Sequence, residues 1–183
     1  MRKKTGLVLI LMVIAAGVAL LLIYPGLLRR ESRQPEVPLP NEEEKVERVT
    51  LYFPNQEYIQ TGREDIAKLK AVDREVKIRE DNLLEAVLQE LRRPPGGEEL
   101  TTALRDDLEV LGAWSKERIA YVNFSSQNLY GGSLQETLLV DQLVKTLTSL
   151  PGIDKVQFLI DGEKRETLMG HLSIDEPLSG DNL

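Results

Sequence analysis

The sequence predicts an α+β fold in which one transmembrane helix precedes a two-layer sandwich, a mostly antiparallel sheet with two main helices on one face. Three patterns indicate this fold: an unbroken apolar or small run at residues 7–24, one-faced helical segments at 82–92 and 133–150, and alternating apolar strands around those helices. Because each helix has a single apolar side, one face of a sheet can cover both.

The run at residues 7–24 contains 18 residues, about 27 Å as a helix against a hydrocarbon core of roughly 30 Å. A cleaved signal peptide is the competing interpretation, but its apolar region usually ends in small residues, whereas Ala15, Ala16 and Gly17 lie mid-run. An uncleaved anchor is therefore favoured. The chain has no cysteine, which excludes a lipid-modified cysteine as the anchor.

Three basic residues precede the run and three follow it, so the flanking charges do not decide its orientation. We favour a cytoplasmic N-terminal tail, because its export would move three basic side chains and the terminal amine across the membrane. The expected location is the cell membrane, with a single pass and an extracytoplasmic C-terminal domain. Membrane lipid is then the expected partner of the N-terminal helix.

Composition predicts four parts along the chain. Residues 1–30 form a cytoplasmic tail and transmembrane anchor, and residues 31–48, rich in proline and glutamate, form an extended stalk. Residues 49–178 have the usual size of one domain, and residues 179–183 form a tail.

The sequence of the first half of the domain predicts two strands, two helices and a hairpin. A strand at 49–53 ends at Pro54-Asn55, a short helix lies near 65–70, and Val76 and Ile78 belong to a second strand. Asn82 caps a helix that extends to Arg92. Further along the chain, apolar runs at 108–114 and 118–124 predict a β-hairpin.

The second half predicts a capped helix followed by a hairpin. Ser133 and Glu136 have the S-x-x-E spacing of a capping box, so the helix should begin at Ser133 and end at Pro151-Gly152. Val156, Phe158 and Ile160 alternate as in a half-buried strand. Asp161-Gly162 predicts a two-residue turn, from which a second strand through Thr167 and Leu168 returns.

Charge argues against nucleic acid as a partner. The chain has a net charge of −7, and residues 31–183 hold 18 basic and 30 acidic residues, a balance of −12 without any basic stripe. Such a surface repels phosphate backbones.

The sequence offers no catalytic set, so we expect no enzyme, no cofactor and no metal, and we assign no catalytic, cofactor-binding or metal-binding residue. His171 is the single histidine, and the cysteine-free chain has no thiol chemistry. We interpret His171 as an ordinary strand-end residue. Asp106, Asp107 and Glu109 are a weak cation candidate, and a solvated acidic turn is the preferred interpretation.

Two further motifs have a functional and a structural interpretation. The segment Tyr130-Gly131-Gly132 precedes a helix start, where free N–H groups can hold an anion, although a flexible loop explains it as well. Trp114 could be an exposed contact residue, but we favour a packed or half-buried position.

Five motifs of the domain resemble, in order and spacing, those of the GerMN domain family. They are 86–91 (AVLQEL) leading to Pro94-Pro95, 120–125 (AYVNFS), Gly132-Ser133 with Glu136, 144–148 (VKTLT), and 156–162 (VQFLIDG). The resemblance covers about residues 49–177, nearly all of the part after the stalk. It implies an envelope protein without known enzymatic chemistry, which in some members acts in spore formation and stabilises a multiprotein complex between two membranes. It also implies an architecture similar to ring-building modules of secretion systems.

Two functions follow as expectations. The preferred one is a membrane-anchored extracytoplasmic protein-interaction domain that supports the assembly or stability of a cell-envelope complex in sporulation or spore germination. Its envelope protein partner is unknown, and the sequence leaves open whether the chain forms a homo-oligomer. The alternative is an extracytoplasmic cell-wall-binding or hydrolytic domain that recruits Asp106, Asp107 or Asp161; two buried acids facing one cleft would favour it.

Overall fold

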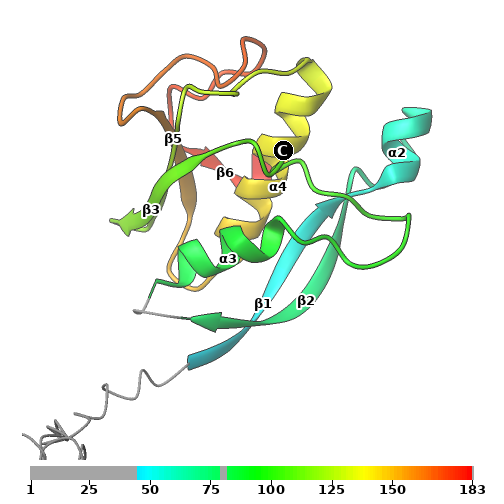
Figure 1. Cartoon of the computed structure of the whole chain (residues 1–183), viewed down its shortest axis with the longest axis horizontal. Helices are drawn as coiled ribbons and strands as arrows, with labels where there is room; N and C mark the ends of the chain where they lie inside the picture. Colours follow the sequence, from blue (N-terminus) through cyan, green and yellow to red (C-terminus); the bar gives the residue numbers. More distant parts are fainter. Residues whose placement is uncertain (1–44, 79–81, 183) are drawn as a thin grey trace, which may run out of the picture. The chain divides into compact units, whose positions relative to one another are not determined.

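Six strands and three α-helices make up the described part of the chain, residues 45–78 and 82–182 of a computed structural model (Figure 1). These residues belong to one unit that extends from residue 42 to residue 183. In chain order the elements are β1 (Lys45–Pro54), α2 (Gln56–Thr61), β2 (Leu69–Ile78), α3 (Leu83–Leu91), β3 (Val110–Lys116), β4 (Ile119–Phe124), α4 (Ser133–Thr148), β5 (Lys155–Ile160), β6 (Leu178–Ser179) and the 3-10 helix η2 (Gly180–Asn182).

The strands form two sheets, where the sequence predicted one. β1 and β2 pair antiparallel over ten residue pairs, and the second sheet has the order β3-β4-β5-β6. Within the second sheet β4 and β5 are parallel, because α4 crosses over between them and returns the chain to the end where β4 began. The α+β class and the mostly antiparallel pairing are consistent with the structure, but the prediction of a single sheet is wrong.

Both main helices contact both sheets. α3 contacts β1, β2 and β3, whereas α4 contacts β1, β5 and β6 (Figure 1). The core between them holds the fully buried rings of Phe53, Phe124 and Phe158 together with the apolar face of α4. The prediction that both helices cover one face of a single sheet is therefore wrong, because a second sheet packs against their other side.

The predicted fold class is also wrong in its transmembrane helix. No helix within residues 45–78 and 82–182 has the length and apolar character to cross a membrane. α4 has 16 residues, fewer than the roughly 20 apolar residues that a span needs, and it includes Glu136, Asp141 and Lys145. The segment 7–24, on which the prediction rested, lies outside the described residues, as does most of the predicted stalk.

The first sheet confirms both predicted strands and relocates the short helix. The helix predicted near 65–70 is wrong, because Leu69 and Lys70 already pair with β1. A helical turn forms earlier, as α2, where the Asn55 side chain accepts a hydrogen bond from Glu57 N and Gly62 ends the helix at φ 63°.

α3 confirms the predicted helix and its cap. The Asn82 side chain accepts a hydrogen bond from Glu85 N at 3.2 Å. The helix buries one stripe of side chains, namely Leu84, Val87, Leu88 and Leu91. The three- and four-residue spacing of this stripe was sufficient to predict the buried face.

The predicted hairpin is confirmed as β3 and β4. Glu117 and Arg118 form its turn, at φ 53° and 64°. The Arg118 carbonyl accepts a hydrogen bond from Asp154 N at 2.8 Å, and the Arg118 guanidinium pairs with the Asp154 carboxylate at 2.5 Å. One turn residue therefore connects the hairpin to the chain that enters β5.

The Arg118 side chain holds the pKa of Asp154 below its ordinary value, chiefly through the side-chain hydrogen bond. A lowered folded-state pKa stabilises the fold above the ordinary carboxyl pKa, and this contribution is lost as the pH falls through the lowered value. We expect Arg118→Gln to raise the Asp154 pKa towards 3.8, as measured by NMR titration of the carboxyl carbon. The matched Arg63→Gln variant should leave it unchanged, and an unmoved Asp154 in Arg118→Gln would contradict the assignment.

The helix α4 begins at the predicted residue, but its capping box is wrong. Gly132 is the N-cap, and no side chain caps the helix. Glu136 is fully buried, and its carboxylate accepts hydrogen bonds from the backbone N–H groups of Leu168, Met169 and His171 at 3.0, 2.9 and 2.7 Å. The carboxylate therefore accepts hydrogen bonds from the backbone of a distant loop and not from the start of its own helix.

The turn after β5 is confirmed, whereas the returning strand is wrong. Ile160 and Glu163 exchange two backbone hydrogen bonds around Asp161-Gly162. Beyond Glu163 the chain forms no named strand before β6, although Thr167 and Ser173 make an isolated bridge. Buried side chains hold this segment instead, because Glu136 binds Leu168 and Gln157 Nε2 donates to Ile174 O at 3.0 Å.

Side chains from α4 and from its C-cap residue, Ser149, form hydrogen bonds with the backbone of one edge of β1. Tyr52 N donates to Thr146 Oγ1 at 3.0 Å, and Ser149 Oγ donates to Thr50 O at 3.1 Å. Thr146 is fully buried. This edge of β1 therefore lies against the helix and is closed to another strand.

Thr146→Val should leave Tyr52 N without its acceptor, at the same side-chain volume. We expect the free energy of unfolding to fall by about 1–2 kcal/mol, the cost of an unsatisfied donor in a partly buried place. Thr148→Val is the control, because Thr148 Oγ1 bonds within its own helix, to Val144 O. Urea unfolding followed by circular dichroism measures both, and equal costs would contradict a specific role for the β1 contact.

Candidate functional site

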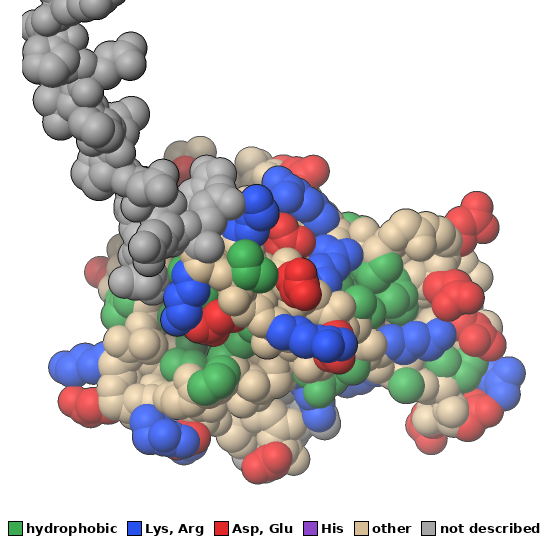
Figure 2. Space-filling model, turned by 90° about the horizontal axis from the view of Figure 1, so that it is seen from below, with side chains coloured by type: hydrophobic (Ala, Val, Ile, Leu, Met, Phe, Trp, Pro, Cys, Tyr) green, Lys and Arg blue, Asp and Glu red, His purple; other side chains and the backbone are tan. Residues whose placement is uncertain are grey.

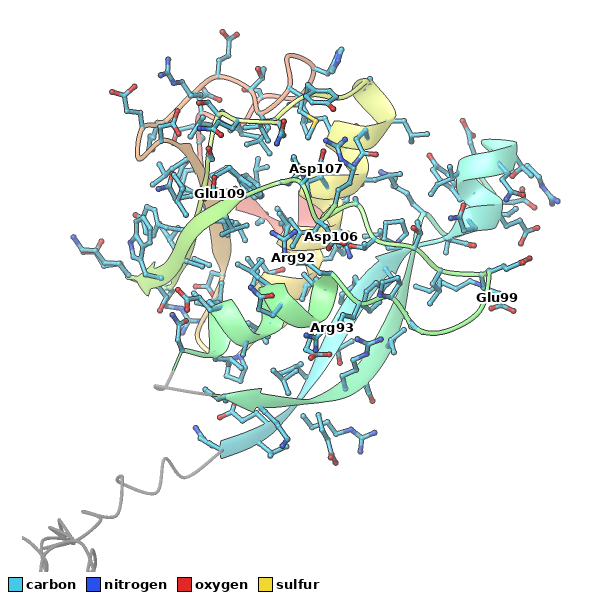
Figure 3. The ribbon with its side chains drawn as sticks, viewed as in Figure 1. Arg92, Arg93, Glu99, Asp106, Asp107 and Glu109 are labelled. Atoms are coloured by element: carbon cyan, nitrogen blue, oxygen red, sulfur yellow. The ribbon has the colours of Figure 1, made fainter. Side chains whose placement is uncertain are left out.

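The acidic residues singled out from the sequence do not converge on a site. Figure 3 shows Asp106, Asp107 and Glu109 on the loop that joins α3 to β3, and all three are exposed. Asp107 pairs with Arg105 at 2.9 Å, and that hydrogen bond holds its pKa below the ordinary value. Arg92, labelled at the end of α3, donates to the carbonyls of Arg105 and Leu108, so it fixes the same loop.

Asp161 and His171 also have structural partners. Asp161 is exposed at φ 51°, and its carboxylate accepts a hydrogen bond from Ser126 N at 3.1 Å. The side chain of Ser126 and, second, this backbone hydrogen bond lower the pKa of Asp161. His171 Nε2 lies 3.2 Å from Gly131 O. His171 lies in the loop held by Glu136, not at the end of a strand as predicted.

Two acids on α4 are buried, and each is already engaged. Glu136 binds the loop at residues 168–171, and Asp141 pairs with Lys68 at 2.5 Å. Among the residues described, no three histidine or acidic side chains gather closely enough to hold a metal ion. The arrangement that would favour hydrolysis, two buried acids facing one cleft, is not formed by Asp106, Asp107 or Asp161.

The loop before α4 is fixed by an arginine. The Arg105 guanidinium donates to Asn128 O at 3.2 Å and Tyr130 O at 3.3 Å, and it lies 5.2 Å from the centroid of the Tyr130 ring. A side chain at Gly131 would require its neighbours to shift, because an added Cβ would lie 2.8 Å from the Met169 sulfur and 2.9 Å from Gln135 Cγ. This segment is therefore a positioned loop between α4 and the residues that Glu136 holds.

Trp114 is exposed on one face and stacked on the other, whereas the sequence favoured a packed or half-buried position. Its side chain is 45% accessible, and one face of the indole stacks on Tyr121, with centroids 5.5 Å apart and planes 4° apart. Leu111 on the same strand is 49% exposed. Large apolar side chains in contact with water are typical of contact surfaces when they gather.

Trp114 and Leu111 lie on an open sheet edge. β3 is the first strand of its sheet, and no named strand of the described chain pairs with its outer side. In an antiparallel pair alternate residues direct their N–H and C=O groups outwards, and the register places Ala113 and Ser115 in that position. Residues 110–115 carry no charge, although charged side chains are a common means of protecting an open edge.

A groove follows this edge. It has a volume of about 730 Å³ and is bordered by β2, α3 and the Val110–Gly112 end of β3. A smaller hollow of about 370 Å³ continues along Ala113, Trp114 and Ser115 to the start of α3. The outer edge of β3 is therefore bordered by hollowed surface along most of its length.

The outer edge of β2 differs in its charge. Lys70, Asp73 and Glu75 are exposed along it. The face seen from below in Figure 1 likewise shows basic and acidic side chains side by side (Figure 2). Charges of both signs make this edge a poor template for another strand.

The open edge of β3 could not be found by searching for chemical groups. The sequence signal was the uncharged run between Glu109 and Lys116, but a run of this kind also fits a central strand. Edge position depends on which strands pair, and that is decided by α4 and the second sheet.

Comparison with known proteins identifies the family. A family model described as "Germane: Sporulation and spore germination" matches residues 50–166, which is more than half of the chain. The chain belongs to the Germane family. Its resemblance to GerMN domains is thereby confirmed, and the Germane domain described above is a domain of sporulation and spore germination proteins.

Solved structures share the fold of this Germane domain. The first GerMN domain of the sporulation protein GerM from Bacillus subtilis has a TM-score of 0.57 at 21% identity, covering 74% of this chain and 98% of that one. The tandem GerMN domains of GerM have a TM-score of 0.52 at 19% identity, covering 73% of this chain and 44% of that one. No curated protein matches the chain.

Proposed function

We propose that the Germane domain is a non-catalytic, extracytoplasmic protein-interaction module that supports the assembly or stability of a cell-envelope complex in sporulation or spore germination. The observation behind this proposal is the open edge of β3, which combines unpaired backbone groups, the exposed side chains of Leu111 and Trp114, and the smaller hollow along Ala113, Trp114 and Ser115. Strand addition at a sheet edge is a common mode of polypeptide recognition.

The chemistry of the edge favours a polypeptide over a small substrate. Backbone donors and acceptors repeat along β3 at the spacing of another strand, whereas the exposed acids Asp106, Asp107 and Asp161 lie outside the strand and do not converge. Trp114 adds a large contact area of the kind that often dominates binding energy. Membership of the family supports the choice of sporulation or spore germination as the process, since its members are proteins of sporulation and spore germination.

One proline substitution at each of the two sheet edges tests the proposal in a spore-forming host that carries the gene. Ser115→Pro removes an outward N–H from β3, and Glu75→Pro removes the corresponding outward N–H from β2. We expect Ser115→Pro to reduce spore yield or germination and to reduce crosslinking to envelope proteins, and we expect Glu75→Pro to do neither. The proposal fails if a stably produced Ser115→Pro chain behaves as the unaltered chain in both measurements.

A further inference from the structure

We infer that the partner at the β3 edge is β3 of a second copy of this chain, paired antiparallel about a two-fold axis at Ala113. The inference rests on the proposed interaction function and names its partner. This pairing of β3 with β3 joins two four-stranded sheets into one continuous sheet across the dimer. Three properties of the strand support it: its outward backbone groups, the side chains opposite one another, and its end charges.

The outward backbone groups of β3 match those of an antiparallel copy. With Ala113 facing Ala113 of the second copy, the outward N–H and C=O of each copy lie opposite those of the other. Ser115 then faces Leu111, the residue at which the register of β3 shifts between Val110 and Gly112. Ala113 at the axis has one of the smallest side chains, so the two backbones can approach without a clash.

The same register places Trp114 of each copy opposite Gly112 of the other. Both residues lie on one face of the sheet, because they are two apart in the strand. A Cβ added at Gly112 meets nothing within 4 Å, so the space over this glycine is open. The indole, already stacked on Tyr121, could cover that space and lose its exposed face to the second copy.

Charges at the ends of β3 favour antiparallel over parallel pairing. Glu109 precedes the strand and Lys116 ends it, and both are exposed. Glu109 has no ionic partner in the described chain, and Lys116 has only a 3.9 Å contact with Glu117. In this register each Lys116 lies opposite Val110 of the other copy, next to Glu109, and the turn residue Glu117 lies level with Glu109. Parallel copies would instead place Lys116 beside Lys116 and Glu109 beside Glu109.

Self-association of the full chain in a non-ionic detergent is the direct test. Sedimentation equilibrium should show a reversible dimer, and Ser115→Pro should weaken dimerisation at least tenfold, because the outward N–H is used only between copies. Glu75→Pro should leave the dimer constant unchanged. Circular dichroism of both variants should match the unaltered chain, which excludes unfolding as the cause of a loss.

Cysteine crosslinking tests the register independently, because the natural chain has no cysteine. Directly opposed, hydrogen-bonded residues have Cα atoms about 5.5 Å apart, within the range of a disulfide. Under mild oxidation, Ala113→Cys should therefore form a covalent dimer, and Glu75→Cys should not. Equal crosslinking at both positions would overturn the interface.

The failure of this inference is distinguishable from failure of the proposed function. If the chain remains monomeric up to its solubility limit but Ser115→Pro still impairs sporulation and Glu75→Pro does not, the second copy is wrong and another protein occupies the edge. If Ser115→Pro also leaves sporulation and envelope crosslinking unchanged, both proposals fall. A dimer that Ser115→Pro does not weaken overturns the β3 interface.

Discussion

Replacing Glu136 with glutamine should lower the free energy of unfolding by about 3 kcal/mol. The carboxylate is fully buried and accepts three backbone hydrogen bonds, one at Oε1 from each of Leu168 and Met169 and one at Oε2 from His171. Glutamine keeps the shape but turns one acceptor oxygen into an NH₂ donor. One or two buried N–H groups would then lose their partner and meet another donor.

Urea unfolding of Glu136→Gln gives the size of the effect, and hydrogen exchange gives its place. The amides of Leu168, Met169 and His171 should exchange faster in the variant, because their acceptor is lost. Glu166→Gln is the matched control, since Glu166 is exposed. Loss of stability without faster exchange at these amides would show that the carboxylate acts elsewhere.

The position of Glu136 explains why a segment with little regular structure lies firmly on the sheet. The carboxylate holds the start of the 168–171 loop, Leu168 is buried beside it, and Ile174 is fully buried further along. Gln157 on β5 donates to the Ile174 carbonyl, which fixes the second point of attachment. Two buried polar side chains therefore replace the ladder of hydrogen bonds that a returning strand would have made.

The contrast between Asn82 and Glu136 shows how far the sequence could predict this fold. Asn82 caps the helix that follows it, because its partner Glu85 N is three residues away and nothing else competes. Ser133 and Glu136 have an equally good local pattern, yet the glutamate turns inwards to a loop more than thirty residues away. Caps, turns and apolar stripes are local and were predictable, but a buried carboxylate chooses its partners in the folded chain.

The same limit applies to the arrangement of strands and to the site. Alternation predicted β1, β3, β4 and β5 as strands, but alternation does not say which strands are neighbours. The division into two sheets depends on contacts such as that between Tyr52 N and Thr146, which close β1 to further pairing. The open edge of β3 is a consequence of that division, and it contains none of the charged residues that drew attention in the sequence.

The ion pair between Lys68 and Asp141 should respond unequally to removal of its two members. Asp141 has 5% of its side chain exposed and Lys68 has 33%, and the two groups lie 2.5 Å apart. Without Asp141, the lysine can reach water along its flexible stem. Without Lys68, the carboxylate stays buried and uncompensated. Lys68→Met should therefore lower the free energy of unfolding by about 3 kcal/mol, and Asp141→Asn by about 1 kcal/mol.

A neighbouring lysine makes the test specific. Lys145 lines the same hollow of about 230 Å³, with Tyr52, Lys68 and Asp141, but makes no ion pair within the described residues. Lys145→Met should therefore cost less than about 0.5 kcal/mol in the same urea titration. If Lys145→Met were as costly as Lys68→Met, general loss of positive charge around Asp141 would explain both results. If only Lys68→Met is costly, the direct contact is what stabilises the buried carboxylate, and with it the packing of α4 against the chain that enters β2.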